Sequence, residues 1–446
     1  MKRIRVTATV ALAVASVLAL GACGGSSSSS SNGSGATTAS GSTSTKGSVQ
    51  IVGVWTGDEQ KAFQAVLAGF KAKYPNVKVT YRSTGDNTPT VLSTAVQGGN
   101  PPDLASVSQP GLVTDFQKKG SLKPMDFAKK TVLANYPPDI EKLGEINGSL
   151  YGLIIKAANK STIWYNVKAF KDAGINAPAT WDEFIKDGNT LKASGIPAYS
   201  IGGADGWTLT DLFENIYLRQ AGPDMYDKLS KHTIKWTDPS VKKALTTMAQ
   251  VIGDSANMAG GTSGALQTDF PTSVSNVFSS SPKAAQVIEG DFVPGVVASS
   301  NPLKPTTGYN VFPFPAIGST GANVVEGGGD VLMMFKDTPA VRALISYLAT
   351  GEAQTIWAKR GGYSAPAKTV PPSAYPDAIT RATATAVGKA KAFVFDLSDL
   401  QPASFGATVG QGEFKIFQDF LKTPSNATGI SKTLESAAAK AYKSGK

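Results

Sequence analysis

The 446-residue sequence has very little of the chemistry on which most catalytic and metal sites depend. It contains one cysteine, Cys23, and one histidine, His232. A single thiol forms no internal disulfide, and one histidine with one cysteine cannot make a zinc site of the usual kind. We therefore expect no metal, no cofactor and no catalysis of the Ser–His–Asp or Cys–His type. An enzyme that works through carboxylates alone, such as a glycosidase, stays open.

Long apolar runs and long basic runs are also missing from most of the chain. After residue 23 no stretch reaches 18 consecutive apolar residues, so we expect no transmembrane helix there. The formal net charge is +10, but no basic run exceeds two residues, which argues against nucleic acid as a partner. Apolar residues make up 41% and aromatic residues 9% of the chain, as in a globular protein.

The N-terminus has the pattern of an exported and anchored protein. Lys2, Arg3 and Arg5 precede an apolar run from residue 10 to 20, and Cys23 follows Leu20-Gly21-Ala22 directly. This resembles the bacterial lipobox, in which a diacylglycerol is attached to the cysteine after the signal is removed. The alternative is an ordinary signal peptide with an incidental cysteine. Residues 24–48 are almost all Gly, Ser, Thr, Ala and Asn, which predicts a flexible tether.

The ordered chain opens with the pattern of a βαβ unit. Residues 49–54 and 77–81 read as strands, and apolar residues between them recur at helical spacing. Thr56 and Glu59 have the spacing of a capping box. A further short strand is expected at 104–107. Strand, helix and strand in this order indicate an α/β fold whose ligand lies beyond the carboxyl ends of the strands, at Trp55, Thr56 and Gln109.

Several motifs along the chain resemble the extracellular solute-binding proteins of ABC sugar importers, the group that includes maltose-binding protein. None is decisive alone, and their order over the chain carries the resemblance. In order they are Gly53-Val54-Trp55-Thr56-Gly57-Asp58-Glu59, Gly98-Gly99-Asn100-Pro101-Pro102-Asp103, Leu150-Tyr151-Gly152-Leu153, Trp164-Tyr165-Asn166, Thr180-Trp181-Asp182-Glu183, Asp205-Gly206-Trp207, Phe312-Pro313-Phe314-Pro315, Gly327-Gly328-Gly329-Asp330 and Tyr347-Leu348-Ala349-Thr350-Gly351-Glu352-Ala353.

The resemblance implies a periplasmic-binding-protein-like fold of class II, with two α/β lobes of mainly parallel sheets joined by a multi-segment hinge. It also implies a monomer on the extracytoplasmic face of the cell membrane that captures a mono- or oligosaccharide, without covalent chemistry, for an ABC permease. Binding of another solute (a polyamine, a polyol phosphate or a peptide) and a secreted carboxylate-only glycosidase are the alternatives. The expected division is 1–22 as signal peptide, 23–48 as lipidated cysteine and tether, 49–156 with 309–362 as N-terminal lobe, and 157–308 with 363–446 as C-terminal lobe.

A sugar presents apolar C–H faces and a ring of hydroxyls, so its site needs aromatic rings and hydrogen-bond acceptors. Trp207, in a Gly-rich loop, is the clearest ring candidate. Trp55 could instead pack under its loop, and Glu59 could serve only as a cap. The resemblance adds the turn at Asp291 and Phe292 and a late aromatic wall at Phe405. The full set of expected ligand contacts is Trp55, Thr56, Glu59, Gln109, Asp205, Trp207, Asp291, Phe292, Gly329, Asp330 and Phe405.

Overall fold

The computed structural model describes residues 44–318, 324–406 and 408–444. The expected signal peptide, Cys23 and the tether up to residue 43 lie outside these residues. Regular secondary structure begins at Gly47, two residues before the predicted start. Among the described residues, no helix combines the length and apolarity needed to cross a membrane.

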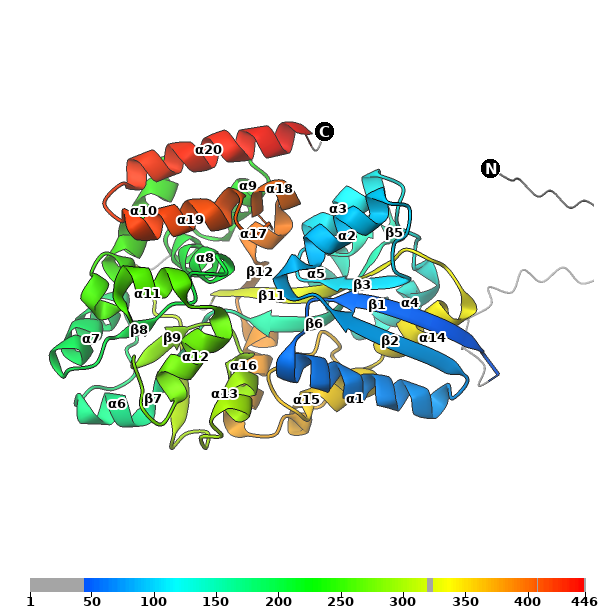
Figure 1. Cartoon of the computed structure of the whole chain (residues 1–446), viewed down its shortest axis with the longest axis horizontal. Helices are drawn as coiled ribbons and strands as arrows, with labels where there is room; N and C mark the ends of the chain where they lie inside the picture. Colours follow the sequence, from blue (N-terminus) through cyan, green and yellow to red (C-terminus); the bar gives the residue numbers. More distant parts are fainter. Residues whose placement is uncertain (1–43, 319–323, 407, 445–446) are drawn as a thin grey trace, which may run out of the picture. The chain divides into compact units, whose positions relative to one another are not determined.

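A mostly parallel sheet of six strands forms one half of the described fold (Figure 1). Its order is β12-β11-β3-β1-β2, with β6 paired to β11. β1 runs parallel to β2 and β3, and β11 runs parallel to β12 but antiparallel to β3 and β6. The predicted βαβ unit is thus confirmed. The strands are β1 (Gly47–Gly53), β2 (Val77–Ser83), β3 (Leu104–Val107), β6 (Gly152–Asn159), β11 (Val324–Met334) and β12 (Ala392–Phe395).

Helices cover both faces of this sheet. Successive side chains of a strand point to opposite faces, and Ile51 and Val52 of β1 accordingly belong to different apolar clusters. Leu332 of β11 joins the first cluster and Val331 joins the second. The inner strands β3 and β6 are accordingly buried at every position, whereas the edge strand β2 alternates between less exposed and more exposed positions.

The second sheet is smaller and mainly antiparallel. Its order is β10-β7-β9-β8, and only β8 and β9 run parallel. Parallel pairing therefore predominates only in the larger sheet, which differs from the expectation for both. The strands of the smaller sheet are β7 (Thr162–Asn166), β8 (Tyr199–Ser200), β9 (Gln286–Ile288) and β10 (Tyr309–Pro313). A separate hairpin joins β4 (Glu145–Ile146) and β5 (Ser149–Leu150).

Some of the helices pack directly on a sheet, and others, such as α10, α19 and α20, pack on neighbouring helices (Figure 1). In the first part of the chain they are α1 (Gly57–Lys73), η1 (Gly85–Asn87), α2 (Thr88–Gln97), α3 (Pro110–Lys118), α4 (Asp126–Asn135), α5 (Pro138–Lys142), α6 (Val167–Asp172), α7 (Trp181–Ala193), α8 (Trp207–Ala221), α9 (Pro223–Ser230) and α10 (Pro239–Ile252). The later ones are η2 (Ser255–Asn257), α11 (Gly261–Gln267), α12 (Phe270–Phe278), α13 (Val293–Ser300), α14 (Pro339–Leu348), α15 (Gly351–Ala358), η3 (Pro372–Ala374), α16 (Ala378–Lys389), α17 (Leu397–Leu400), α18 (Ala403–Gly406), α19 (Gly412–Lys422) and α20 (Ala427–Ser444).

We call the larger sheet with α1–α5, α14 and α15 the first lobe, and the smaller sheet with α6–α13, α19 and α20 the second lobe. The chain passes between them from β6 to β7, from β10 to β11, and from β12 to α17. The sequence analysis placed the return to the first lobe at residue 309. β10 lies instead in the smaller sheet, because Tyr309 and Phe312 pack into the core of the second lobe. The last passage was expected near residue 363, but Ser364 bridges Ala157 of β6, and β12 re-enters the larger sheet.

The buried helix α8 holds these three passages together through polar side chains. The amide of Asn215 donates to the carbonyl of Lys160 at 3.1 Å and to Oε2 of Glu326 at 2.6 Å. Glu214 accepts from the backbone N–H of Ser398 at 3.1 Å. Lys160 follows β6, Glu326 lies on β11, and Ser398 follows β12. One helix of the second lobe is therefore bonded to every segment that connects the lobes.

Candidate functional site

A cavity of about 400 Å³ lies between the two lobes. Its first-lobe wall is formed by residues that follow β1 and β3, as expected for the carboxyl ends of parallel strands. Its second-lobe wall is formed at the starts of α8 and α12. The expected contacts that line it are Trp55, Thr56, Glu59, Gln109, Asp205, Trp207, Phe292, Gly329 and Asp330.

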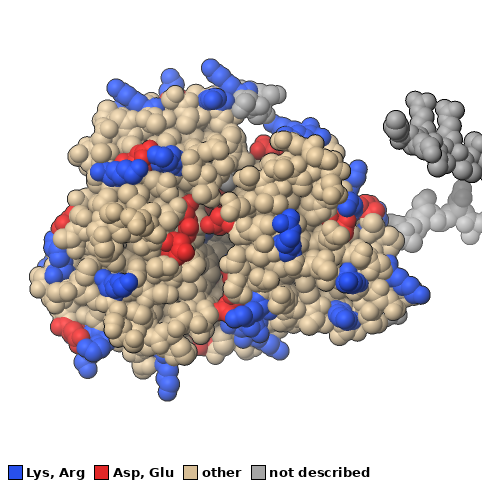
Figure 2. Space-filling model, viewed as in Figure 1, with Lys and Arg blue, Asp and Glu red and all other residues tan. Residues whose placement is uncertain are grey.

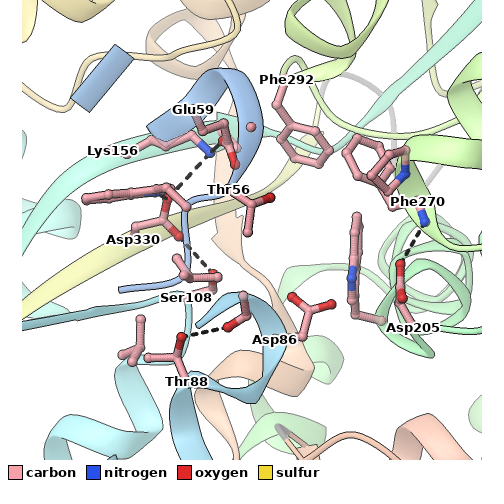
Figure 3. A pocket seen from close by; sticks show the side chains of 18 of the residues that line it. Thr56, Glu59, Asp86, Thr88, Ser108, Lys156, Asp205, Phe270, Phe292 and Asp330 are labelled. Carbon is pink, nitrogen blue, oxygen red and sulfur yellow. Dashed lines mark hydrogen bonds and ion pairs between the residues drawn. The ribbon is translucent and has the colours of Figure 1, made fainter. Parts of the chain in front are cut away.

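Asp330 is the centre of the first-lobe wall (Figure 3). Its Oδ2 accepts from Nε1 of Trp55 at 2.7 Å, and its Oδ1 accepts from Oγ of Ser108 at 2.8 Å. The ammonium of Lys156 lies 3.4 Å from Oδ2. A register irregularity between Asp330 and Val331 interrupts the pairing of β11 with β6, and a bulge of this kind re-aims a side chain. Through these bonds Asp330 connects the residues that follow β1 and β3 at the cavity.

Glu59 does not cap its helix. Thr56 is the N-cap of α1, but its side chain makes no capping bond, so the predicted capping box is wrong. Glu59 pairs instead with the ammonium of Lys156. Burial would lower the pKa of Lys156, but the carboxylates of Glu59 and Asp330 outweigh it and raise the pKa. Lys156 is therefore a permanent cation in this wall, with two carboxylates already bound to it.

The glycines before Asp330 serve the sheet rather than a ligand. A Cβ on Gly329 would lie 2.6 Å from the carbonyl oxygen of Lys156, and one on Gly327 would lie 2.5 Å from that of Ala158. Both contacts are far shorter than a side chain tolerates. The triple glycine thus lets β11 and β6 pair closely, although Gly329 also lines the cavity.

Three aromatic rings of the second-lobe wall lie close together. Trp207, at the first position of α8, lies 5.3 Å from Phe270 and 6.1 Å from Phe292 between ring centroids. Phe270 and Phe292 meet edge to face at 5.2 Å. Lysines of the connecting segment lie against two of these rings: Lys156 is 5.3 Å from the centroid of Phe292, and Lys160 is 5.4 Å from that of Trp207.

Three carboxylates from both lobes surround the same indole. Asp86 lies in η1 of the first lobe and accepts a hydrogen bond from Trp207. Asp205 accepts from the backbone N–H of Phe270 at 2.7 Å, and Asp269 caps α12. Burial, together with the negative charges of Asp86 and Asp269, raises the pKa of Asp205 to about 6, although the hydrogen bond from Phe270 opposes this shift. These groups lie close enough to repel one another across the cavity.

A buried acidic cluster lies behind the aromatic wall. One oxygen from each of Asp211, Glu326 and Asp396 lies within 4.8 Å of the others, a spacing that could hold a metal ion. The ammonium of Lys160 already binds two of them, with Asp211 at 3.0 Å and Asp396 at 2.5 Å. The cluster thus contains its own cation. Burial and the neighbouring Asp396 raise the pKa of Asp211 to about 7 despite that cation.

Two of the expected contacts lie away from the cavity. Asp291 is 2% exposed and accepts from the hydroxyl of Ser364, so it ties the turn before α13 to the segment beside β6. Phe405 is fully buried and packs edge to face on Trp236 at 5.6 Å. Both are core residues because the loops that carry them turn inward.

Trp55 lines the cavity but is only 1% exposed. Its ring packs at 4.6 Å from Phe63, 5.0 Å from Trp357 and 5.9 Å from Tyr81. The indole therefore belongs to the core of the first lobe, and its N–H orients Asp330. Of the two predicted roles, packing of the Trp55 ring under its loop describes the structure better than an exposed ring surface for the ligand.

Sequence reasoning missed a number of residues of the cavity wall, among them Asp86, Lys156, Lys160, Asp269 and Phe270. Asp86 follows a strand end, which the positional rule could have found. Asp269-Phe270-Pro271 reads as a helix start, and only the fold shows that this start faces the cavity. Lys156 and Lys160 lie in or just after β6, where no local pattern distinguishes them.

The fold and sequence of this chain are similar to those of known binding proteins. The family model described as bacterial extracellular solute-binding protein matches residues 55–355. The chain is 31% identical over 364 residues to the osmoprotective compounds-binding protein GgtB of Synechocystis sp., covering 80% of this chain and 85% of GgtB. It is 32% identical over 372 residues to the alpha-glucosides-binding periplasmic protein AglE of Rhizobium meliloti, covering 81% of each.

Among solved structures, the bacterial solute receptor AcbH matches with a TM-score of 0.79, covering 90% of this chain and 100% of that one at 21% identity. AcbH is described as having an exclusive preference for β-D-galactopyranose. The GacH receptor of Streptomyces glaucescens matches with a TM-score of 0.70 at 18% identity, covering 90% of this chain and 98% of GacH. At these identities the structures establish the fold: two α/β lobes of the type seen in such receptors.

Proposed function

Because the chain belongs to the bacterial extracellular solute-binding proteins, we propose that it is the substrate-capturing subunit of an ABC importer and that its ligand is a carbohydrate. The family is one of extracellular binding proteins, which supports a location outside the cytoplasm and a binding role without catalysis. AglE is named for α-glucosides and AcbH is described for a galactopyranose, which supports the choice of a sugar.

The composition of the two walls is the single observation that carries this proposal. The second lobe contributes the rings of Trp207, Phe270 and Phe292, while the first lobe contributes Asp330, Gln109 and further polar groups. A pyranose has the complementary form, because one face of the ring is apolar C–H and the rim carries hydroxyls. A saccharide between the lobes would bury its C–H face on Trp207 and donate hydroxyl hydrogens to Asp330.

Closure around the sugar follows from the location of these groups on separate lobes. A ligand that contacts both walls binds the closed form more tightly than the open form and shifts the population toward it. The three passages held by α8 would supply the hinge, since each connects one lobe to the other. The closed protein would then deliver the sugar to the membrane permease, with no covalent chemistry on the ligand.

Calorimetric titration and thermal-shift measurement of the purified protein against mono-, di- and trisaccharides test this function. We expect saturable binding of at least one saccharide, a higher melting temperature, and no release of reducing sugar over hours. No binding across the panel would contradict the proposed ligand class. Turnover of a saccharide would favour the glycosidase instead.

We also infer that Cys23 carries a lipid anchor. The support is the lipobox pattern of Leu20-Gly21-Ala22-Cys23 with its charged and apolar leader. Two acyl chains on one cysteine give lasting attachment to a membrane. In cells, Cys23→Ser should move the protein from the membrane fraction to the medium, and retention of the variant on the membrane would contradict the anchor.

A further inference from the structure

The charge of the cavity is opposite to the charge of the chain. The formal net charge is +10, yet the residues that line the cavity include eight carboxylates and only two lysines. Figure 2 shows the same segregation: Asp and Glu gather at the groove where the lobes meet, and Lys and Arg are spread over the outer surface. The groove is negative although the chain as a whole is positive. This local negative charge therefore acts on the ligand that enters the groove.

The two lysines do not offset the carboxylates toward a ligand. Lys156 is bound by Glu59 and Asp330, and Lys160 by Asp211 and Asp396. Each ammonium thus already faces two negative groups. Among the described residues, Asp86, Asp205 and Asp269 form no ion pair with a lysine or arginine, although they come from both lobes and face the same space.

Much of the hydrogen-bonding capacity that side chains present to the cavity belongs to acceptors. The buried Oε1 of Gln109 has no partner, and it lies in the same wall as Asp330. A carboxylate accepts hydrogen bonds and donates none, so Asp86, Asp205 and Asp269 add more acceptors. Trp55 and Ser108 already donate to Asp330, and the Thr56 hydroxyl and the Gln109 amide nitrogen are further donors. A ligand that donates hydrogen bonds through hydroxyl or ammonium groups therefore complements these carboxylates.

Helix N-termini bring partial positive charge to the cavity, but less of it than the negative charge of the carboxylates. Residues at the starts of several helices, among them α1, α2, α3, α8 and α12, line the cavity, and each N-terminus carries the equivalent of about half a positive charge. Together they offset only a part of eight carboxylates less two ammonium groups. Asp269 already caps α12, and Asp58 and Glu59 occupy the first turn of α1. The field inside the cavity remains negative.

We propose that Asp86, Asp205 and Asp269 make this site select by charge: it accepts neutral and amino sugars and rejects sugars that carry a phosphate or carboxylate. This rests on the proposed function and narrows its ligand class. Phosphate and carboxylate groups bring acceptors and negative charge to a wall that already has both, and like charges placed together cost binding free energy. A hydroxyl or an ammonium at the same position donates to these carboxylates.

Matched sugars of different charge test the proposal by calorimetry on the purified protein. The panel is galactose with galactosamine and galacturonate, glucose with glucosamine and glucuronate, and trehalose with trehalose 6-phosphate. We expect that in every series that binds, the anionic member binds at least about tenfold more weakly than the neutral one. Equal affinity for the anionic and neutral members would overturn the charge selection and leave carbohydrate binding intact. If no saccharide binds, either in these series or in the wider panel of mono-, di- and trisaccharides, the proposed function fails and this inference with it.

The double variant Asp86→Asn with Asp269→Asn assigns the effect to these residues. Asparagine keeps an acceptor and still caps a helix, so α12 should stay folded. The ratio of the affinity for the neutral sugar to the affinity for the anionic sugar should fall by at least about threefold in this variant. The matched control, Asp172→Asn on α6, removes an exposed carboxylate paired with Lys168 and should leave the ratio unchanged. An unchanged ratio in the double variant, with the fold intact by circular dichroism, would overturn the assignment.

Discussion

Two indoles of this protein line one cavity and have different roles. Trp207 is partly exposed at the start of α8, whereas Trp55 is buried among Phe63, Tyr81 and Trp357. A strand end predicted Trp55 at the cavity and a Gly-rich loop predicted Trp207 there, but neither signal could show how many rings pack around each indole. That number depends on residues far away in the sequence, such as Trp357.

Alanine substitution separates the two roles. Trp207→Ala should weaken saccharide binding by about 1–3 kcal/mol and change the free energy of unfolding by less than about 1 kcal/mol. Trp55→Ala leaves a void in the core and deprives Asp330 of a donor, so it should cost about 3–5 kcal/mol of stability. Urea unfolding and calorimetry measure the two effects. Similar stability losses in both variants would mean that Trp207 is also a core residue.

Asp291 predicts a dependence of stability on pH. Burial raises its pKa from 3.8 to about 6 in the folded protein. Below pH 3.8 the group is protonated whether or not the chain is folded, and it costs nothing. As the pH rises from about 4 to about 6 the unfolded chain releases the proton more readily, so the free energy of unfolding falls.

Asp291→Asn should therefore be more stable than the wild type at pH 8, by about 1–3 kcal/mol, with the difference vanishing near pH 4. Asparagine still accepts the hydrogen bond of Ser364. Urea unfolding at both pH values measures the difference, and Asp172→Asn on the surface is the control. A variant that is less stable at pH 8 would contradict this role of burial.

At the scale of elements, sequence patterns predicted those features that depend on residues close together in the chain. The predicted βαβ unit and the predicted strand at 104–107 are present, and Thr180 forms a capping box with Glu183, three residues later. The same capping spacing at Thr56 and Glu59 failed, because Lys156 from a strand about a hundred residues later competes for the Glu59 carboxylate. The passages between lobes were misplaced for a similar reason: sheet membership of β10 depends on pairing with β7, which no local signal encodes.

The two threonines form a matched pair for measurement. Thr180→Ala removes a side-chain bond to the backbone N–H of Glu183 and should cost about 1 kcal/mol of stability. Thr56→Ala removes no capping bond and should change stability by less than about 0.5 kcal/mol, although it alters the cavity wall. Chemical unfolding of both variants gives the comparison. Equal losses would indicate that Thr56 caps α1 after all.

At the scale of the whole described body, α8 links the ligand wall to the hinge. Its first residue, Trp207, faces the cavity, and two turns later Asn215 holds two of the passages between the lobes. A ligand that fixes the indole therefore acts on the helix to which these passages are bonded. This arrangement could not be read from the sequence, because the partners of Asn215 lie more than 50 residues away from it along the chain.

The variant Asn215→Ala tests whether α8 supports the passages between the lobes. It leaves Glu326 and the carbonyl of Lys160 without their buried donor, so we expect a loss of about 2–4 kcal/mol in the free energy of unfolding. Thr246→Ala on the exposed face of α10 should cost less than about 0.5 kcal/mol and serves as the control. If both variants unfold at the same urea concentration, the passages do not depend on α8.

The capture of a saccharide between the lobes is tested most directly by a crystal structure of the protein grown with a sugar that binds in the calorimetric panel. We expect the sugar in the cavity, with an apolar face on Trp207 and a hydroxyl bonded to Asp330. A sugar bound outside the cavity, or one that contacts a single lobe while the cavity stays empty, would contradict the proposed function.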